Sequence, residues 1–412
     1  MKFKNPKGTK DYFEKEMAIQ RKVFDSLRGT ALKFGFKEVE PPVVESFELL
    51  AAKQGEEIKN QIFTIEKKGD ERLALRAEFT PSLVRMFIDE QKKIPKPVKW
   101  FTINKVWRYE RPQSGRDREF FQFNCELIGS DKPESDAEVI SVIIESLKSL
   151  GLKENQFVLK INNSKLLQGI VENFSKKVDG VIRVIDKRAK VDEKDFLEML
   201  KDEGVKNPKE LVKILDLKDI VKIKKLELND QAKEGAEEMG SIMDLLDNKC
   251  VELSLSTARG LAYYTGTVFE VFDKDEKLRS IAGGGRYDKM IEQFGGEKCP
   301  VTGFGMGYST LLQLLEMNKL VPEIDLGPEY FIAVVDEDVV KDAVKIANKL
   351  RENNSVEIDL MRRKLGKQFS YADSIGAKKV IVVGPDEIKE GKVKIKDMDS
   401  GKEKKVEISE LK

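Results

Sequence analysis

Apolar residues along the chain recur with two periods, one typical of helices and one typical of strands. Between residues 17 and 34 they return every three or four positions, and the same spacing is found at 136–150. One face of an α-helix has this period, so we expect an amphipathic helix in each segment. A further helix is expected at 81–89, because Pro81 suits a first turn, where its missing N–H has no helical partner.

Two β-rich segments, 98–109 and 119–128, are joined by a polar stretch at 110–118 that contains three arginines. Adjacent strand-like runs connected by polar residues predict a hairpin, here with a long, arginine-rich loop. A shorter strand is expected at 72–76, ahead of the helix at 81–89.

The character of the chain changes between residues 165 and 245. Strand signals fade there and charge-dense helical patterns dominate, so we expect a helical insertion. β-rich segments resume at 251–255 and 265–272. Two glycine clusters follow, at 283–285 and 303–307, and neither matches a dinucleotide or P-loop fingerprint. We interpret both as tight turns, which could also bring the backbone close to a ligand.

The C-terminal part begins after a linker at 318–328 that contains Pro and Gly. Strand and helix patterns then alternate, and a final hairpin turns near residue 400. Such alternation predicts a small α/β domain with a largely parallel sheet. The expected division is therefore a first domain at 1–320, with the insertion at 165–245 inside it, and a second domain at 329–412.

Composition excludes several kinds of chemistry. The 412 residues include no His, so an imidazole base, a Ser-His-Asp triad and a His-ligated metal are ruled out. The cysteines Cys125, Cys250 and Cys299 are far apart and form no C-x-x-C, so we expect no metal site and no disulfide framework.

Charge and hydropathy point to a protein of the cytoplasm. Lys and Arg number 74 and Asp and Glu 73, so no polybasic tail dominates the chain. No stretch approaches the ~18 apolar residues of a membrane span, and the first residues do not resemble a signal peptide. We therefore expect a soluble, cytoplasmic protein without a membrane segment.

Several polar side chains could form a ligand site, although each also has an ordinary structural explanation. Arg108 closes the first strand of the hairpin, and Arg259 precedes a β-rich segment. A guanidinium on a strand can clamp phosphate through two parallel hydrogen bonds, but it could equally form a surface ion pair. Gln122 and Glu126 lie four apart on one strand and so face the same side. They would either converge in a pocket or lie on a half-exposed sheet.

Taken together, these segments resemble the histidyl-tRNA synthetases, a class II aminoacyl-tRNA synthetase family, along almost the whole chain. The second class II motif and the segment peculiar to the family carry the resemblance most specifically. The matching segments are PKGTKD at 6–11, the dimer-forming first motif at 34–45, RYERPQSGRDREFFQFNCE at 108–126, ARGLAYYTGTVFE at 258–270, AGGGRYD at 282–288 and LGKQFSYADSIGA at 365–377.

The resemblance implies an α+β fold: an antiparallel class II sheet core with a helical insertion, followed by a C-terminal α/β anticodon-binding domain. It implies a homodimer and a two-step reaction. L-Histidine and ATP, with Mg²⁺, give histidyl-adenylate and pyrophosphate, and the histidyl group then moves to the 3′ end of tRNA(His). The histidine carboxylate is already ionised at neutral pH and needs no protein base to attack the α-phosphate, so a chain without His suffices.

The same resemblance implies a set of ATP-binding residues. Arg108 and Arg259 would place positive charge around the α-phosphate, where charge develops in the transition state. Phe120 would stack on adenine. Arg116 would reach the outer phosphates or the tRNA end.

A histidine pocket is implied in the same way. Glu126 and Tyr264 would hold the two imidazole nitrogens. A desolvated carboxylate left unpaired by an analogue without that N–H gives rejection of roughly 10⁴–10⁵. The other residues implied to bind the substrate are Glu78, Thr80 and Gln122 at its ammonium group, with Tyr263 and Tyr287 lining the pocket.

The chain departs from the family pattern at three positions. Thr310 stands where the third class II motif usually has an arginine, Ala262 where an acid is frequent, and Phe121 where a histidine is frequent. Thr310 favours one rival hypothesis, a catalytically inactive synthetase-like regulatory subunit of histidine biosynthesis. Arg108, Arg259 and the C-terminal domain argue against it. A second rival, a synthetase for proline, threonine or glycine, is disfavoured by the segment from Arg259 to Tyr264.

Overall fold

The computed structural model describes residues 3–52, 59–66, 69–246, 249–258 and 264–411. The chain folds into two compact units, one of Met1–Asp11 with Gln20–Pro322 and the other of Tyr12–Ile19 with Glu323–Lys412. The α+β fold class expected from the sequence is confirmed by the sheets and helices of these units.

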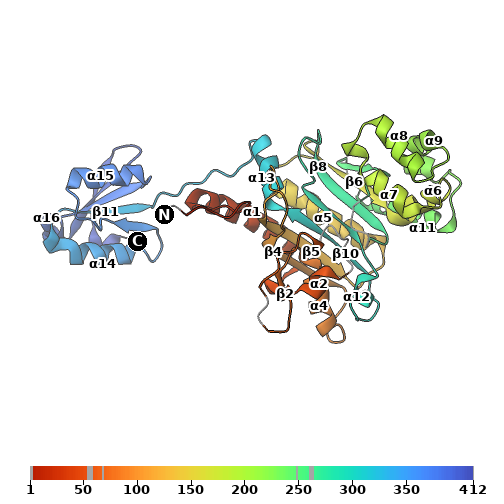
Figure 1. The fold of residues 1–412 in the computed structure, drawn as a ribbon. Coiled ribbons are helices and arrows are strands. Elements are labelled where there is room, and N and C mark those ends of the chain that lie inside the picture. The colour runs from red at the N-terminus through yellow and green to blue at the C-terminus, as the bar shows by residue number, and fades with distance from the viewer. Residues whose placement is uncertain (1–2, 53–58, 67–68, 247–248, 259–263, 412) are drawn as a thin grey trace. The chain divides into compact units, whose positions relative to one another are not determined.

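The larger unit is built on an eight-stranded sheet (Figure 1) with the spatial order β1–β4–β5–β10–β9–β8–β6–β7. Neighbouring strands are antiparallel, except for the outer pairs β1–β4 and β6–β7, which are parallel. The strands are β1 (Lys37–Glu38), β4 (Val98–Trp107), β5 (Glu119–Ile128), β6 (Phe157–Asn163), β7 (Val251–Leu253), β8 (Thr267–Asp273), β9 (Ala282–Arg286) and β10 (Val301–Gly307).

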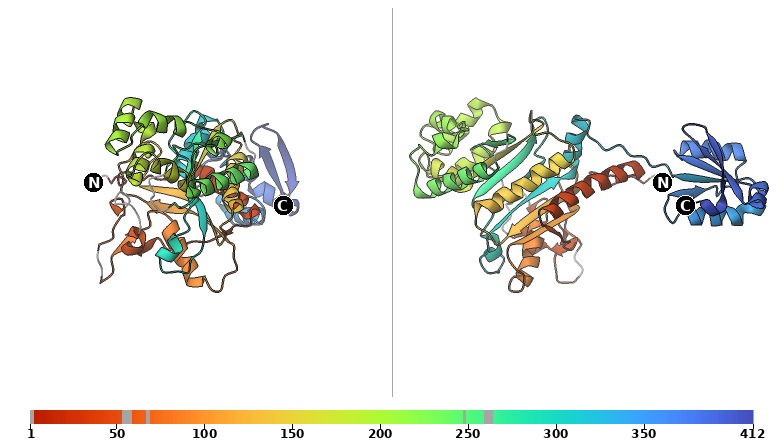
Figure 2. Two further views of the ribbon diagram at one scale, coloured as in Figure 1. Left: turned by 90° about the vertical axis from the view of Figure 1, so that its right-hand side faces the viewer. Right: turned by 180° about the vertical axis from the view of Figure 1, so that it is seen from behind.

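Two long helices run side by side along one face of this sheet, α1 (Glu14–Lys33) and α5 (Pro133–Ser149), as the views in Figure 2 show. Both were expected from their apolar periodicity. Ile140 and Ile143 of α5 are fully buried, and Phe24 of α1 packs against Phe121 of β5 with ring centroids 5.2 Å apart. Burying apolar area between helix and sheet stabilises this layer by about 25 cal/mol per Å².

Shorter elements complete the larger unit. A small antiparallel sheet pairs β2 with β3, and α13 follows β10 directly. These elements are β2 (Val44–Ser46), α2 (Phe47–Ala51), β3 (Leu73–Leu75), α4 (Thr80–Glu90), α12 (Met290–Gln293) and α13 (Tyr308–Met317).

Helices fill the segment between β6 and β7, drawn in green in Figure 1. They surround a core of their own, in which Phe196, Leu200 and Leu211 are almost completely buried. The helical character expected between residues 165 and 245 is confirmed. The helices are α6 (Ser164–Glu172), α7 (Val178–Asp186), α8 (Glu193–Asp202), α9 (Pro208–Leu215), α10 (Ile220–Ile223) and α11 (Asp230–Leu246).

The C-terminal unit has a five-stranded sheet with the order β12–β11–β13–β14–β15. We expected a largely parallel sheet. β11 is indeed parallel to both of its neighbours, but β14 and β15 add an antiparallel hairpin to the edge. The elements are β11 (Tyr330–Val334), α14 (Val340–Leu350), β12 (Val356–Ile358), α15 (Leu365–Ser374), β13 (Lys379–Val383), α16 (Pro385–Glu390), β14 (Lys392–Asp397) and β15 (Glu403–Glu407).

The interpretation of the two glycine clusters as tight turns was wrong, because they form the central strands β9 and β10. Glycine is unusual in strands, since it packs no side chain. Here atoms of the adjoining strands occupy the space where a side chain would lie. A Cβ on Gly284 would lie 2.1 Å from the carbonyl oxygen of Gly303, and one on Gly303 would lie 1.8 Å from Oε2 of Glu126. Only glycine permits this approach.

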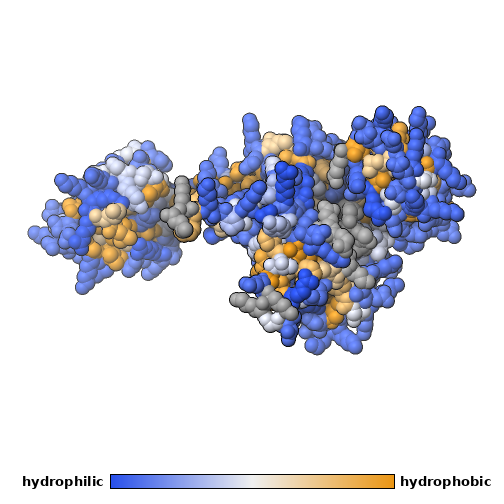
Figure 3. Space-filling view, viewed as in Figure 1, coloured by the Kyte–Doolittle hydropathy of each residue, from blue (hydrophilic) through white to orange (hydrophobic). Residues whose placement is uncertain are grey.

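Charged residues make up 36% of the chain, and hydrophilic side chains accordingly cover most of the face seen in Figure 3. None of the helices in the described ranges combines the length and the apolar character that crossing a membrane requires.

Candidate functional site

A cavity of about 920 Å³ lies in the larger unit, bordered by the central strands and by residues of the helical insertion. It gathers residues that are far apart in the sequence. Eight of the residues singled out from the sequence line it: Glu78, Thr80, Arg108, Arg116, Gln122, Glu126, Tyr264 and Tyr287. Arg259 and Tyr263 lie outside the described residues, as does Ala262.

The floor of the cavity is formed by β5 and β10. Alternate side chains of a strand face the same side, so Gln122, Asn124 and Glu126 of β5 all face the cavity. Opposite them in register stand glycines of β10, with Gly305 facing Asn124 and Gly303 facing Glu126. A Cβ on Gly305 would lie 2.1 Å from Nε2 of Gln122. The glycines therefore make room for the polar side chains of the neighbouring strand.

Glu126 is the most deeply buried acid of the cavity, with 2% of its surface exposed. The hydroxyl of Thr80 donates to its Oε1 at 2.9 Å, and the hydroxyl of Tyr287 donates to its Oε2. Burial raises the pKa of Glu126 to about 8 in spite of these donors, and the nearby charge of Glu78 acts in the same direction. With this pKa, the carboxyl of Glu126 is largely protonated at neutral pH, and it can donate to a ligand nitrogen or ionise to accept from one.

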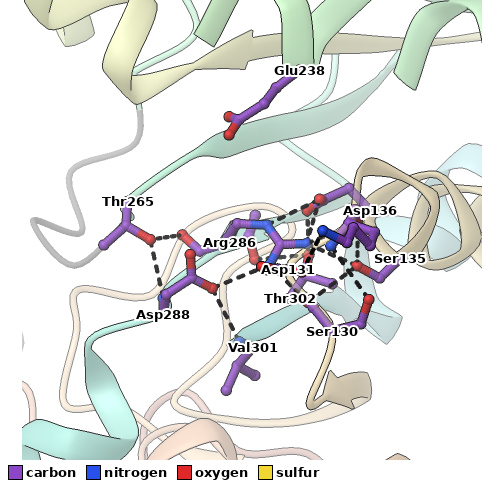
Figure 4. Close-up of polar contacts among 12 residues, drawn as sticks. Ser130, Asp131, Ser135, Asp136, Glu238, Thr265, Arg286, Asp288, Val301 and Thr302 are labelled. Atoms are coloured by element: carbon purple, nitrogen blue, oxygen red, sulfur yellow. Dashed lines mark hydrogen bonds and ion pairs between the residues drawn. The ribbon is translucent and has the colours of Figure 1, made fainter. Parts of the chain in front are cut away.

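Tyr287 is held in place by a buried ion pair on its N-terminal side (Figure 4). Arg286 donates to Oδ2 of Asp136 from both Nε, at 3.0 Å, and Nη2, at 2.6 Å, and both side chains are at most 5% exposed. Thr302 donates to the other oxygen of Asp136 at 2.8 Å. On the other side, the backbone N–H of Asp288 donates to the hydroxyl of Thr265 at 3.0 Å. This network ties β9 to the start of α5, so the backbone around Tyr287 has little freedom.

The aromatic wall of the cavity consists of Tyr264 and Tyr287, whose ring centroids are 6.4 Å apart in an edge-on arrangement. Gly285 allows this packing. Gly285 has a φ of +156°, and its backbone lies close to Tyr264. A Cβ at this position would be 2.8 Å from the tyrosine ring.

A second cavity, of about 300 Å³, shares Arg108, Arg116 and Gln122 with the first and is also lined by Phe120. Arg108 donates from Nε to the carbonyl of Ala77 at 2.8 Å, and its guanidinium carbon lies 5.6 Å from the centroid of the Phe120 ring. Arg116 forms an ion pair with Glu110. Guanidinium groups beside an aromatic ring suit a ligand that carries phosphate on a flat, aromatic base.

Thr310 lies at the edge of this second cavity, 5% exposed, in the first turn of α13. The loop between β4 and β5 packs directly on that turn. Thr310 Oγ1 lies 3.5 Å from the carbonyl oxygen of Gly115, Ser309 donates to Asp117 at 3.0 Å, and Gln313 donates to Ser114 at 2.9 Å. The short side chain of Thr310 therefore takes part in holding this loop on α13.

Phe121 does not belong to either cavity. It packs between Phe24 and Tyr308, with ring centroids 5.2 and 6.5 Å away. The departure at this position therefore affects the packing beneath the sheet.

Sequence reasoning missed Asn124 and Glu270, which also line the larger cavity. Asn124 could have been found, because it lies between Gln122 and Glu126 with the same two-residue period. Among the described residues, no three His, Cys, Asp or Glu side chains cluster as a metal site. Mg²⁺ in a nucleotide site needs only one or two carboxylates besides the phosphates, so it requires no such cluster.

Comparison with known proteins identifies the family to which the chain belongs. The model of the family described as histidyl-tRNA synthetase matches residues 8–311, and that of an anticodon binding domain matches residues 329–412. The histidine--tRNA ligase of Pyrococcus horikoshii is 40% identical over 420 residues, covering 98% of this chain and 96% of that protein.

Two solved structures share the fold. The histidyl-tRNA synthetase from Nostoc sp. PCC 7120 superposes with a TM-score of 0.84 at 24% identity, covering 100% of this chain and 99% of that one. An ATP phosphoribosyltransferase regulatory subunit/histidyl-tRNA synthetase from Bacillus halodurans C gives a TM-score of 0.79 at 22% identity, covering 93% of this chain and 99% of that one. At these identities the likeness concerns the fold alone, whereas the family model and the archaeal relative match by sequence: the chain belongs to the histidyl-tRNA synthetase family.

Proposed function

We propose that this chain is a histidine--tRNA ligase, which activates L-histidine with ATP and transfers the histidyl group to tRNA(His). The proposal is supported by relatives of that name over nearly the full chain. Within the structure, the observation that carries it is Glu126, a buried carboxyl at the end of a polar cavity.

The pocket around Glu126 suits an imidazole ring. Thr80 and Tyr287 orient the two carboxyl oxygens, and Tyr264 and Tyr287 provide aromatic surface beside them. We assign Glu126 and Tyr264 to the imidazole nitrogens and Glu78, Thr80 and Gln122 to the ammonium group. Tyr287, and Tyr263 by resemblance, line the pocket. A substrate without a ring N–H would leave Glu126 desolvated and unpaired, which is how such a site would select histidine.

Activation of histidine needs no protein base, because the substrate carboxylate is already ionised. The protein has to align this carboxylate with the α-phosphate and to stabilise the charge that develops there. Arg108 is suited to this task because the carbonyl of Ala77 fixes its Nε and so orients the guanidinium, which lines both cavities. Arg259 would act from the opposite side by resemblance, Phe120 would stack on adenine, and Arg116 would serve the outer phosphates or the tRNA end.

Mg²⁺ would enter with ATP, and Glu270 is the carboxylate we assign to it. Bound there, the ion would neutralise phosphate charge. We also propose that residues 1–320 form the catalytic domain with the insertion at 165–245, and that residues 329–412 bind the anticodon. The match of the anticodon binding model to residues 329–412 supports the second assignment.

A homodimer is part of the proposal. The first-motif segment at 34–45 exposes apolar side chains, with Val43 38% and Val44 42% exposed, as a surface covered by a second copy would. Sedimentation equilibrium of the full chain tests this, and a monomer at micromolar concentration would contradict it. The enzyme would work in the cytoplasm, where translation uses charged tRNA.

The rival function, an inactive regulatory subunit, is less well supported. Its support came from Thr310, which replaces the arginine usual in the third motif. The packing of the β4–β5 loop on Thr310 provides a structural explanation for that residue. The anticodon binding domain also has no evident use in a protein that does not charge tRNA.

ATP–pyrophosphate exchange, with each of the twenty amino acids offered singly, tests the proposal. We expect exchange with histidine alone. Exchange with another amino acid would reassign the pocket, and no exchange from a folded protein would favour the regulatory function.

A further inference from the structure

The second cavity contains one arginine that neither the motifs nor the resemblance assigned. Arg279 lines both cavities, and its guanidinium faces the same space as Arg108 and Arg116. It comes from the turn at 274–281 between β8 and β9, far in sequence from the loop that carries Arg116. We propose that Arg279 binds the outer phosphates of ATP, and so supplies the positive charge that Thr310 cannot.

The turn that carries Arg279 is rigid. Asp273, 1% exposed, accepts hydrogen bonds from the backbone N–H groups of Lys277 at 3.1 Å and Leu278 at 2.7 Å. Directly after Arg279, the carbonyl of Ile281 accepts from the N–H of Gly307 at 3.0 Å. The backbone is therefore fixed on both sides of Arg279, and its side chain is aimed into the cavity by the fold.

The basic neighbours of Arg279 on the same turn are engaged elsewhere. Lys274 forms an ion pair with Glu252 at 2.8 Å and Lys277 with Asp275 at 2.7 Å. Among the described residues, Arg279 has no carboxylate within 4.0 Å, and its recorded partner is the neutral amide of Gln113, with Nη1 3.4 Å from Oε1. A long hydrogen bond to a neutral group is easily exchanged for phosphate oxygens, which match the guanidinium fork.

The charge of the second cavity also favours an anion. It is lined by the three arginines against two carboxylates, Glu110 and Asp117. Both carboxylates are already engaged, Glu110 with Arg116 and Asp117 with Ser309 at 3.0 Å. Arg279 thus provides positive charge beyond these pairs, and Gln113 links it to the loop that carries Arg116.

Packing explains why the charge comes from position 279. The β4–β5 loop lies on the first turn of α13, where a Cβ on Gly115 would already be 2.8 Å from Oε1 of Gln313. Thr310 is enclosed by this packing, with Oγ1 3.5 Å from the carbonyl oxygen of Gly115. The turn at 274–281 borders the same cavity, and the side chain of Arg279 is exposed there.

The test compares Arg279→Ala with Lys277→Ala, which removes a positive charge from the same turn but does not line either cavity. Because the inference rests on the proposed function, two kinds of measurement are needed: histidine-dependent ATP–pyrophosphate exchange, and equilibrium dialysis of ATP and AMP with the full chain. Loss of a charged hydrogen bond should raise the KM for ATP and for pyrophosphate by about 10- to 100-fold. The KM for histidine and the Kd for AMP should change by less than about threefold, and Arg279→Lys should be intermediate.

Unchanged ATP binding in Arg279→Ala would overturn the inference, and so would an equal loss of AMP, which lacks the outer phosphates. An equal effect of Lys277→Ala would mean that the turn acts only through its general charge and would overturn it too. If the unaltered chain showed no exchange with any amino acid, the proposed function would fail. The affinities for ATP and for AMP, each measured by equilibrium dialysis, would still decide the role of Arg279.

Discussion

Replacing Glu126 with Gln should make the larger unit more stable at alkaline pH. Gln has nearly the shape of a protonated Glu side chain but cannot ionise. In the native protein Glu126 is buried and its pKa is raised to about 8 from an ordinary value of 4.5. Above the folded pKa, the native pocket must hold a buried carboxylate whose two hydroxyl donors do not offset its desolvation, and the variant does not bear that cost.

The sign and size follow from proton linkage. Between pH 4.5 and pH 8 the folded protein keeps a proton that the unfolded chain has released, so the free energy of unfolding falls as pH rises, by about 1.4 kcal/mol per unit. Across the window set by the two pKa values of Glu126 this amounts to about 5 kcal/mol. The amide nitrogen of Gln cannot accept a hydrogen bond, so one of the two bonds from Thr80 and Tyr287 is lost, at a cost of about 1–2 kcal/mol. The variant should therefore be the less stable protein at pH 5 and the more stable one at pH 8.5.

Tryptophan fluorescence during urea unfolding measures this directly. The chain has two tryptophans, Trp100 and Trp107, and both lie on β4 of the larger unit. Trp100 stands opposite Glu126 in the register of β4 and β5, so the signal follows the sheet that carries the pocket. The matched control is Glu198→Gln, which removes the same charge from an exposed position on α8.

A difference between variant and native protein that stays constant within about 1 kcal/mol from pH 5 to pH 8.5 would refute the reasoning. It would mean that Glu126 is ionised in the folded pocket throughout, and that its donors outweigh burial. A pH trend of the same size in Glu198→Gln would assign the effect to net charge rather than to the pocket.

Three further outcomes are expected from the same structure. Glu126→Ala should raise the KM for histidine in pyrophosphate exchange by at least about 100-fold while that for ATP changes less than about threefold; equal losses would refute the assignment. Gly303→Ala should abolish histidine binding in equilibrium dialysis, because its Cβ would lie 1.8 Å from Oε2 of Glu126 and 2.6 Å from a backbone carbonyl; retained binding would show that the floor can yield. Asp136→Asn should lower the free energy of unfolding by about 3–5 kcal/mol, because the buried Arg286 loses the carboxylate that accepts two of its hydrogen bonds and keeps the longer ion pair with Asp288, at 3.2 Å; a loss below about 1 kcal/mol in the urea assay would mean that Asp288 compensates for it.

Much of the secondary structure could be predicted from periodicity. The hairpin of β4 and β5 and the helices α1, α5 and α13 follow from local patterns, because each has a clear apolar face. The strands β9 and β10 could not be found in this way. Glycines carry no hydrophobic pattern, and they form strands here because side chains of the neighbouring strands fill the space beside them.

The candidate site, like the fold, could be predicted only in part from the sequence. The residue types of the pocket were recognised by resemblance, and the structure brings those that it describes to two adjoining cavities. The protonation of Glu126 and the packing on Thr310 depend on contacts between residues 160 or more apart in the chain. Such contacts leave no trace in local spacing, and for that reason Arg279 also went unnoticed.

The glycine-lined floor of the cavity has a consequence for how such an enzyme can change over time. Where a pocket is lined by side chains, its shape can be altered one substitution at a time. Here the surface facing Gln122 and Glu126 is main chain, and any side chain added at Gly303 or Gly305 strikes its neighbour at 1.8 or 2.1 Å. Amino-acid preference could then drift only through β5 and the tyrosine wall. The shape of the pocket along β10 would therefore stay constant, while the side chains of β5 and of the tyrosine wall could vary.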